Sequence, residues 1–258
     1  MIRDSKIEGL PGVSAQHLPW DSDFFKADMA KVLYAGGQPT HTQDFVHCIR
    51  SATGSVYQRF NVFAEVPSEA IGAMQTLQSN GFRLIETRLN YYHTLADIPS
   101  GLKKARVATN ADIPALKMVA SGAVNAFDKY HADPFFTEAE ANTYLETYVS
   151  NCVNGFAEAV FVPDLPSQPA SFAAISRLNE PGWKAAGPVF RIPLTACLPE
   201  NSGWHFPLCG AALEHARNQG GSCLIMTTQS TNRAVVHNCE KLGFKLGSTT
   251  HLFSISSK

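Results

Sequence analysis

The sequence predicts an α/β protein (α+β in its mixture of elements), with a mixed, mainly antiparallel sheet flanked by helices. Helix-type and strand-type segments alternate along the chain, which favours this fold class. A helix, a Gly-Phe pair and a strand also occur twice, at 74–87 and at 236–249. This internal similarity indicates either two related α/β units or the chance recurrence of a common connection.

Length and composition set broad limits on function. The 258 residues suffice for one large domain or two small ones, and the net charge of −1 provides no broad basic surface for nucleic acid. The six cysteines follow neither a zinc-type nor a disulfide-framework spacing, which favours reduced thiols. Without a signal peptide or an apolar run of about 20 residues, we expect a cytoplasmic protein that binds neither membranes nor nucleic acid.

Residues 1–101 are expected to form a small N-terminal α/β domain, because Pro99, Ser100 and Gly101 interrupt a strand and indicate a linker. Ser68 is the expected N-cap of a helix in this part. The predicted elements are strands at 30–36, at 56–67 and after Phe82, and helices at 40–52 and 68–81.

Residues 102–258 are expected to form a second domain. A strand at 104–109 precedes a helix at 110–124, for which Asn110 or Asp112 is the expected cap. A helix at 137–153 has Thr137 and Glu140 in the spacing of a capping box. The remaining predicted elements are strands at 158–164, 170–178 and 188–198, a loop at 199–207, a helix at 208–221, a strand at 222–229, a helix at 232–242 and a strand at 248–256.

This order of elements over 104–258 resembles the GNAT acetyltransferase superfamily. The segment NRAVVHNCEKLGF resembles the family's common Asn-x-x-Ala-x-x-x-Tyr-x-x-x-Gly-Phe ending, with Asn232, Gly243 and Phe244 matching and Cys239 at the tyrosine. The segments YHADPFFTEAEANTYLETYVSN, LPWDSDFF and GFRLIETRLNYYH resemble TDP-fucosamine N-acetyltransferase and its relatives, which acetylate a nucleotide-linked amino sugar. The resemblance implies that the N-terminal domain is a partial GNAT-like domain.

The resemblance also implies an activity: transfer of an acetyl or related acyl group from a CoA thioester to the amine of a small acceptor. Acetyl-CoA is then a co-substrate, no metal is needed, and a homodimer is compatible with the family. In the family a splayed strand pairs with the pantetheine amides, and a loop before a helix holds the pyrophosphate. The implied cofactor-binding residues are Thr195, Cys197, Leu198, Gly203, Trp204, His205, Gly210 and Asn232.

The phosphate loop departs from the family pattern. His205 stands at the usual basic position, Leu208 stands at the first glycine, and only Gly210 is retained. Pro207 has no N–H to donate, so the loop offers fewer donors to a phosphate. A neutral His205 donates one hydrogen bond, and a protonated one adds a positive charge.

Cys239 leaves two interpretations open. A thiol at the position of the family's tyrosine can return a proton to the leaving CoA thiolate. However, Val235, Cys239 and Leu242 share one apolar face of the helix, and a buried cysteine usually behaves as a small hydrophobic residue.

The segment FDKYHADPFF (127–136) is implied by the resemblance to lie on the acceptor side of the site. Tyr130, Asp133 and Phe135 are the expected substrate-binding residues. His131 is the expected base, or a water relay serves instead, because the strand at 188–198 contains no acidic residue. The alternative is a loop whose aromatic side chains only cover the core.

Two other functions remain compatible with the sequence. The altered phosphate loop and the missing tyrosine also suit a catalytically degenerate binding protein with this fold. An acyltransferase that takes its thioester from a carrier protein needs less contact with the CoA phosphates.

Overall fold

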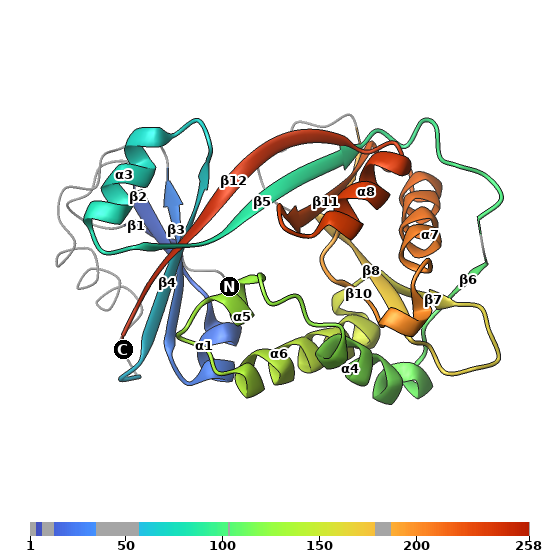
Figure 1. Ribbon diagram of the computed structural model, residues 1–258, viewed down its shortest axis with the longest axis horizontal. Helices are drawn as coiled ribbons and strands as arrows, with labels where there is room; N and C mark the ends of the chain where they lie inside the picture. The colour runs from blue at the N-terminus through green and yellow to red at the C-terminus, as the bar shows by residue number, and fades with distance from the viewer. Residues whose placement is uncertain (1–3, 7–12, 35–56, 103, 179–186, 258) are drawn as a thin grey trace. The chain divides into compact units, whose positions relative to one another are not determined.

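The computed structural model describes residues 4–6, 13–34, 57–102, 104–178 and 187–257 (Figure 1). The chain divides into two compact units by contacts. Unit 1 comprises Met1–Arg88, Phe127–Glu140 and Ser248–Lys258, and unit 2 comprises Leu89–Ala126 and Ala141–Gly247. Each unit is described below by itself.

The two units differ from the predicted ranges 1–101 and 102–258. The chain passes from unit 1 to unit 2 within strand β5 (Arg83–His93) and re-enters unit 1 for Phe127–Glu140. It returns to unit 1 for the last time within strand β12 (Lys245–Ser256). Linkers are recognised in a sequence by Pro and Gly, and a boundary inside a strand has neither. The linker-like residues near Gly101 therefore placed the predicted boundary after this strand. The division into two folding domains stays a prediction, because contacts do not measure independent folding.

Unit 1 is built on one sheet with the order β1-β2-β3-β4-β12-β5. Strands β3 and β4 pair in parallel, whereas β1–β2, β2–β3 and β4–β12 are antiparallel. The strands introduced here are β1 (Asp4–Lys6), β2 (Val13–His17), β3 (Asp28–Tyr34) and β4 (Phe60–Pro67).

One face of the unit 1 sheet is apolar and is covered by helix α3 (Ile71–Ser79). Val62, Ala64 and Val66 of β4 pack there with Leu77 of α3, as expected for alternate residues of a strand. The predicted N-cap was wrong, because α3 begins after Ala70 and the Ser68 hydroxyl donates instead to the Thr249 carbonyl (3.1 Å). The helix predicted at 40–52 lies outside the described residues.

Two short helices also belong to unit 1. They are α1 (Pro19–Phe25) and α5 (Lys129–Ala132). Phe25, Tyr130 and Phe136 form an aromatic cluster, with ring centroids 4.6–5.7 Å apart. The predicted capping box is confirmed: the Thr137 amide donates to the Glu140 carboxylate (2.8 Å), and the Glu140 amide donates to the Thr137 hydroxyl (3.2 Å).

Unit 2 contains a second stretch of sheet with the order β5-β11-β9-β8-β7-β6, and β10 pairs with β8. The β9–β11 pair is parallel, whereas β6–β7, β7–β8, β8–β9 and β8–β10 are antiparallel. The predicted mixed, mainly antiparallel sheet is thus confirmed. The strands are β6 (Ala105–Val107), β7 (Ala159–Pro163), β8 (Ser171–Leu178), β9 (Val189–Ile192), β10 (Thr195–Cys197) and β11 (Cys223–Gln229).

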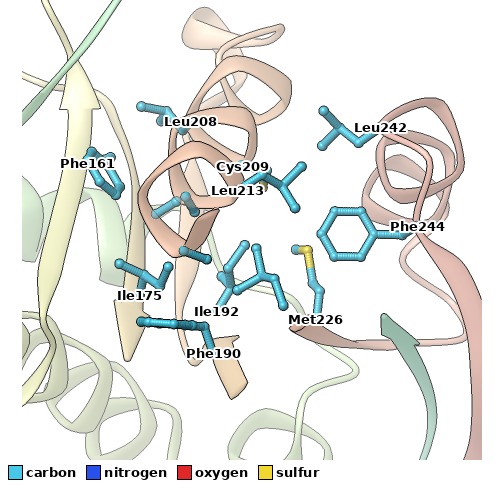
Figure 2. Packing of buried hydrophobic residues seen from close by; sticks show 14 of the residues in the cluster. Phe161, Ile175, Phe190, Ile192, Leu208, Cys209, Leu213, Met226, Leu242 and Phe244 are labelled. Atoms are coloured by element: carbon cyan, nitrogen blue, oxygen red, sulfur yellow. The ribbon is translucent and has the colours of Figure 1, made fainter. Parts of the chain in front are cut away.

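Helices cover both faces of the unit 2 sheet. Phe161, Phe190 and Met226 pack with Leu213 of α7 in one core (Figure 2). Cys239 of α8 belongs to the same core. On the other face, Val160, Val162 and Phe172 pack against residues of α4 and α6. The helices are α4 (Ile113–Gly122), α6 (Glu138–Asn151), α7 (His205–Asn218) and α8 (Arg233–Lys241), with short turns at Asn110–Asp112, Cys152–Phe156 and Pro199–Asn201.

Several helix ends follow the sequence prediction. Gly81 and Gly243 take the left-handed conformation after α3 and α8, with φ of 82° and 87°. Asp112, one of the two expected caps, is the N-cap residue of α4, although its side chain makes no capping hydrogen bond to that helix. Thr109 caps the short turn Asn110–Asp112, and Asp112 completes that capping box by accepting from the Thr109 amide (2.8 Å). Among the described residues, all five cysteines are free thiols.

Candidate functional site

The sheet of unit 2 splits at the end of β9. Val189–Ile192 pair in parallel with Cys223–Met226 of β11. Pro193 follows, and the chain continues as β10, which pairs with β8. The end of β11 and β10 therefore do not pair with each other in the described part of the chain. The predicted single strand at 188–198 is two strands, because a proline cannot continue the ladder.

The register of β10 shows which amides face the split. The Ala174 amide donates to the Leu194 carbonyl (2.9 Å), and the Leu198 amide donates to the Ala170 carbonyl (3.0 Å). Antiparallel ladders alternate, so the N–H and C=O groups of Thr195 and Cys197 point away from β8. Of the three residues expected to bind pantetheine, Thr195 and Cys197 present backbone groups on the open edge, whereas the Leu198 amide is already used.

Helix α7 begins at His205, three residues earlier than predicted, so part of the expected loop is helical. Pro207 lies in the first turn, where an N–H has no partner inside the helix and its loss costs little. Gly203 is exposed just before the helix, and Trp204 packs partly against the core of unit 2.

The Cys197 thiol lies at this helix start. It donates to the Asn201 carbonyl at 3.0 Å. Burial raises the pKa of Cys197, although the backbone N–H groups of His205 and Trp204 act in the opposite direction. The Trp204 amide also donates to the Asn201 carbonyl (3.2 Å), so it already has a partner within the protein.

Gly210 lies in the second turn of α7 and not at its start. A Cβ on Gly210 would lie 2.0 Å from Cδ1 of Leu102. This glycine is therefore explained by the close approach of the Leu102 side chain. Its cofactor-binding role stays a prediction.

His205 is buried, and burial lowers its pKa to about 4. Its ring is thus neutral at pH 7 and supplies no charge to a phosphate. The Asn238 side-chain amide donates to His205 Nδ1 (3.0 Å) and links α8 to α7. Sequence reasoning missed this contact because Asn238 and His205 are 33 residues apart.

Cys239 is fully buried in the core of unit 2. Its sulfur lies 3.6 Å from the Met226 sulfur, and burial raises the pKa of the thiol to about 12. This environment favours the core-packing interpretation over a proton donor at an open site. Asn232 caps α8, accepting from the Val235 amide (3.3 Å).

The expected acceptor residues, Tyr130, His131, Asp133 and Phe135, all belong to unit 1, whereas the expected cofactor-binding residues belong to unit 2. Tyr130 Oη lies 3.4 Å from Asp21, and His131 Nδ1 lies 2.8 Å from Asp128.

Asp133 and Phe135 are held by neighbouring side chains. The Asp133 carboxylate accepts from the Asn61 side-chain amide (2.9 Å) and from the Phe135 backbone amide (3.0 Å). Arg59 lies 4.6 Å above the Phe135 ring. Phe136 and Asp133 are buried, as expected if part of this segment covers the core.

The Asp128 carboxylate orients the His131 ring. A neutral ring that donates its Nδ1–H to Asp128 carries its basic lone pair on Nε2. This pairing suits a base and was not predicted, although Asp128 lies three residues before His131. Lys129, which directly follows Asp128, is buried and was also missed.

The described residues were searched for metal-ligating clusters and for membrane-spanning helices. They contain no cluster of three or more metal-ligating side chains. None of their helices is long and apolar enough to cross a membrane.

Comparison by sequence finds no relative: neither a protein-family model nor a curated protein matches the chain. Comparison by structure finds many. A GCN5-related N-acetyltransferase from Kribbella flavida aligns with a TM-score of 0.60 and 15% identity, covering 98% of this chain and 89% of its own. One from Sphaerobacter thermophilus aligns with a TM-score of 0.59 and 9% identity, covering 95% and 76%.

A third similar structure is N-myristoyltransferase from Saccharomyces cerevisiae with bound myristoyl-CoA. Its TM-score is 0.52 with 11% identity, covering 90% of this chain and 61% of that one. At these identities the likeness concerns the fold. The chain therefore has the fold of the GCN5-related N-acetyltransferases, as its element order implied.

Proposed function

We propose that the protein is an N-acyltransferase that moves an acetyl or related acyl group from a CoA thioester to the amine of a small acceptor. The observation that carries this proposal is the split beside β10 in a chain with the GNAT fold. There, Thr195 and Cys197 direct backbone groups to an open edge. Pantetheine contains two amides, which are suited to pair with such an edge.

In the proposed reaction, the acceptor nitrogen attacks the thioester carbonyl and forms a C–N bond. The C–S bond breaks and CoA leaves as a thiolate. The nitrogen loses a proton to a base, and the thiolate gains one. A backbone N–H on the open edge of β10 is suited to stabilise the developing oxyanion.

We assign the base to His131, because Asp128 fixes its ring orientation. Tyr130, Asp133 and Phe135 are assigned to acceptor binding, and a nucleotide-linked amino sugar is the proposed acceptor. These assignments rest on the resemblance of 130–151 to sugar N-acetyltransferases. Cys239 as the proton donor to CoA remains the alternative to a core role.

The experiment follows thiol release from acetyl-CoA with purified protein and a panel of TDP-linked amino sugars and simple amines. We expect release that depends on both substrates, and the acetylated amine as product. His131→Gln should lower kcat with little change in KM, while Phe135→Leu should mainly raise KM. No turnover with any amine, together with no binding of acetyl-CoA, would contradict the proposal.

A second function is favoured by a specific observation. The start of α7 has a neutral, buried His205, a proline in its first turn and a Trp204 amide that already donates to the Asn201 carbonyl. This is a weak cradle for a pyrophosphate. It suits an enzyme that takes its acyl group from a carrier-protein thioester, or a binding protein that has lost catalysis. Acyl transfer from a phosphopantetheinylated carrier protein but not from acetyl-CoA would establish the first of these.

A further inference from the structure

The second face of the unit 1 sheet carries buried polar groups. Val62 and Val66 of β4 face the apolar core with α3, so Asn61, Phe63 and Glu65 face the other way. Asn61 is 0% exposed, and Ser254 of β12 is 1% exposed. A sheet face that only packs against helices does not need such residues.

These groups gather around the ring of Phe63. Ser254 lies directly opposite Phe63 in the β4–β12 ladder, and Asn61 is its same-face neighbour along β4. The Lys129 amine lies 3.4 Å from the centre of the ring. Asp133, one turn after Lys129, accepts from the Asn61 side-chain amide (2.9 Å). Three elements of unit 1 thus bring polar side chains to one aromatic ring.

Two of these buried side chains lack a partner. Asn61 Oδ1 and Ser254 Oγ have no hydrogen-bond partner among the described residues. Within the same part of the chain, the Lys129 amine contacts the ring faces of Phe63 and Tyr130, and no hydrogen bond or ion pair of this amine is found. Buried polar groups in native proteins are generally hydrogen-bonded, so Asn61 Oδ1 and Ser254 Oγ call for a partner, and the Lys129 amine beside them still has donors to offer.

The charges around Lys129 indicate the kind of partner. Burial lowers the pKa of Lys129 to about 7, and the positive charge of Arg88 acts in the same direction. Asp21, Glu86 and Asp133 act in the opposite direction. Because both signs surround the amine, neither an anion nor a cation gains a net attraction. A neutral group that both donates and accepts hydrogen bonds suits the site best.

We propose that unit 1 binds a hydroxyl-bearing ligand, of the sugar type, through Lys129, Asn61 and Ser254. A ligand hydroxyl accepts from the Lys129 amine and donates to Asn61 Oδ1, and Ser254 Oγ bonds to a neighbouring hydroxyl. If the protein is the proposed N-acyltransferase, this site holds the hydroxyls of its amino-sugar acceptor. That last step rests on the proposed function, whereas the binding itself does not.

The test is a titration of the full-length protein with three probes, followed by saturation-transfer NMR. Glucosamine and glucose both carry hydroxyls, whereas cyclohexylamine has a ring and an amine without them. We expect saturable binding of both sugars and none of cyclohexylamine. Lys129→Met should weaken sugar binding about tenfold or more, the usual effect of losing a hydrogen bond to a charged or partly charged group.

Ser254→Ala separates binding from folding. Because the Ser254 hydroxyl has no partner, its removal should leave the melting temperature unchanged or raised, while sugar binding weakens about fivefold. Lys104→Met, the same change at an exposed lysine of unit 2, is the matched control and should leave binding unchanged.

The proposal is overturned if neither sugar binds, or if binding survives both Lys129→Met and Ser254→Ala. Its failure is distinguishable from failure of the proposed function. Sugar binding without any acyl transfer would leave this site standing alone. If cyclohexylamine were acetylated as efficiently as glucosamine, the proposed acyltransferase function would be supported and the proposed sugar-binding site would be contradicted.

Discussion

Cys239 illustrates how a residue's surroundings decide between two roles that its sequence position leaves open. The helical spacing already placed it on an apolar face with Val235. The structure adds full burial beside Met226 and a thiol pKa of about 12. A thiol in this position remains protonated and touches protein atoms.

Replacing this residue tests the core role. Cys239→Ala should lower the free energy of unfolding by about 1–3 kcal/mol, because it leaves a small cavity in the core. The kcat per folded molecule should stay within about twofold. Urea unfolding and thiol-release assays measure the two quantities. Cys223→Ala, at a half-buried strand position, is the control; a tenfold fall in kcat specific to Cys239→Ala would instead support the proton donor.

Lys129 carries a cost that depends on pH. Its pKa of about 7 lies below the ordinary value near 10, so the unfolded chain binds more protons between these values. Stability therefore rises as pH increases from about 7 to about 10, and the full penalty is present below pH 7.

Lys129→Met should accordingly be more stable than the original protein at pH 6, by on the order of a few kcal/mol. The difference should shrink towards pH 10. Urea unfolding at pH 6, 8 and 10 measures it. A difference in stability that is independent of pH would show that burial does not lower the pKa of the Lys129 amine.

At the scale of elements, helix α7 shows where sequence reasoning succeeded and where it stopped. The helix and its apolar residues were predictable from their spacing. Its start was not, because Pro207 read as a loop residue although a proline fits the first turn of a helix. Gly210 packs against Leu102, which lies 108 positions earlier in the chain, so no local sequence pattern could predict this contact.

This contact yields a packing prediction. Gly210→Ala should cost no more than about 1 kcal/mol, because its Cβ would lie 2.0 Å from Leu102 Cδ1, which is the end of a flexible side chain that can shift, and alanine favours a helix interior over glycine. The double variant Gly210→Ala, Leu102→Ala should recover part of that loss, giving a coupling energy of about 0.5 kcal/mol or more. Thermal unfolding of the four proteins in this cycle measures it, and strict additivity would show that the two groups do not meet.

The start of α7 also predicts a substrate preference. Because His205 is neutral and the Trp204 amide already donates to the Asn201 carbonyl, the CoA phosphates should contribute little to binding. Acetyl-pantetheine should then support a kcat/KM within about tenfold of that for acetyl-CoA, since losing strong phosphate contacts would cost more. A thousandfold preference for acetyl-CoA would show that the helix start does hold the phosphates.

At the scale of the whole molecule, the sequence predicted the fold class and most helices and strands of unit 2. Which segments belong to each of the two units could not be predicted from the sequence. Segment Phe127–Glu140 joins unit 1, and both β5 and β12 contribute residues to each unit. These are long-range pairings such as Ser254 with Phe63, and local periodicity carries no information about them.

The candidate site shows the same limit. The residues of the split strand could be anticipated from the resemblance, and the register then distinguished Thr195 and Cys197 from Leu198. Lys129, Asn61 and Ser254 could not be grouped from sequence, because they lie on three separate elements. Burial and unpaired atoms, which only the fold reveals, brought them together.

In the proposed function, the open edge of β10 binds the pantetheine of an acyl-CoA. Amide hydrogen exchange with and without acetyl-CoA tests it most directly. We predict that the Thr195 and Cys197 amides exchange rapidly alone and are protected about tenfold or more by acetyl-CoA, while the Leu198 amide, bonded to Ala170, is protected throughout. Unchanged exchange at Thr195 and Cys197 under saturating acetyl-CoA would contradict the account.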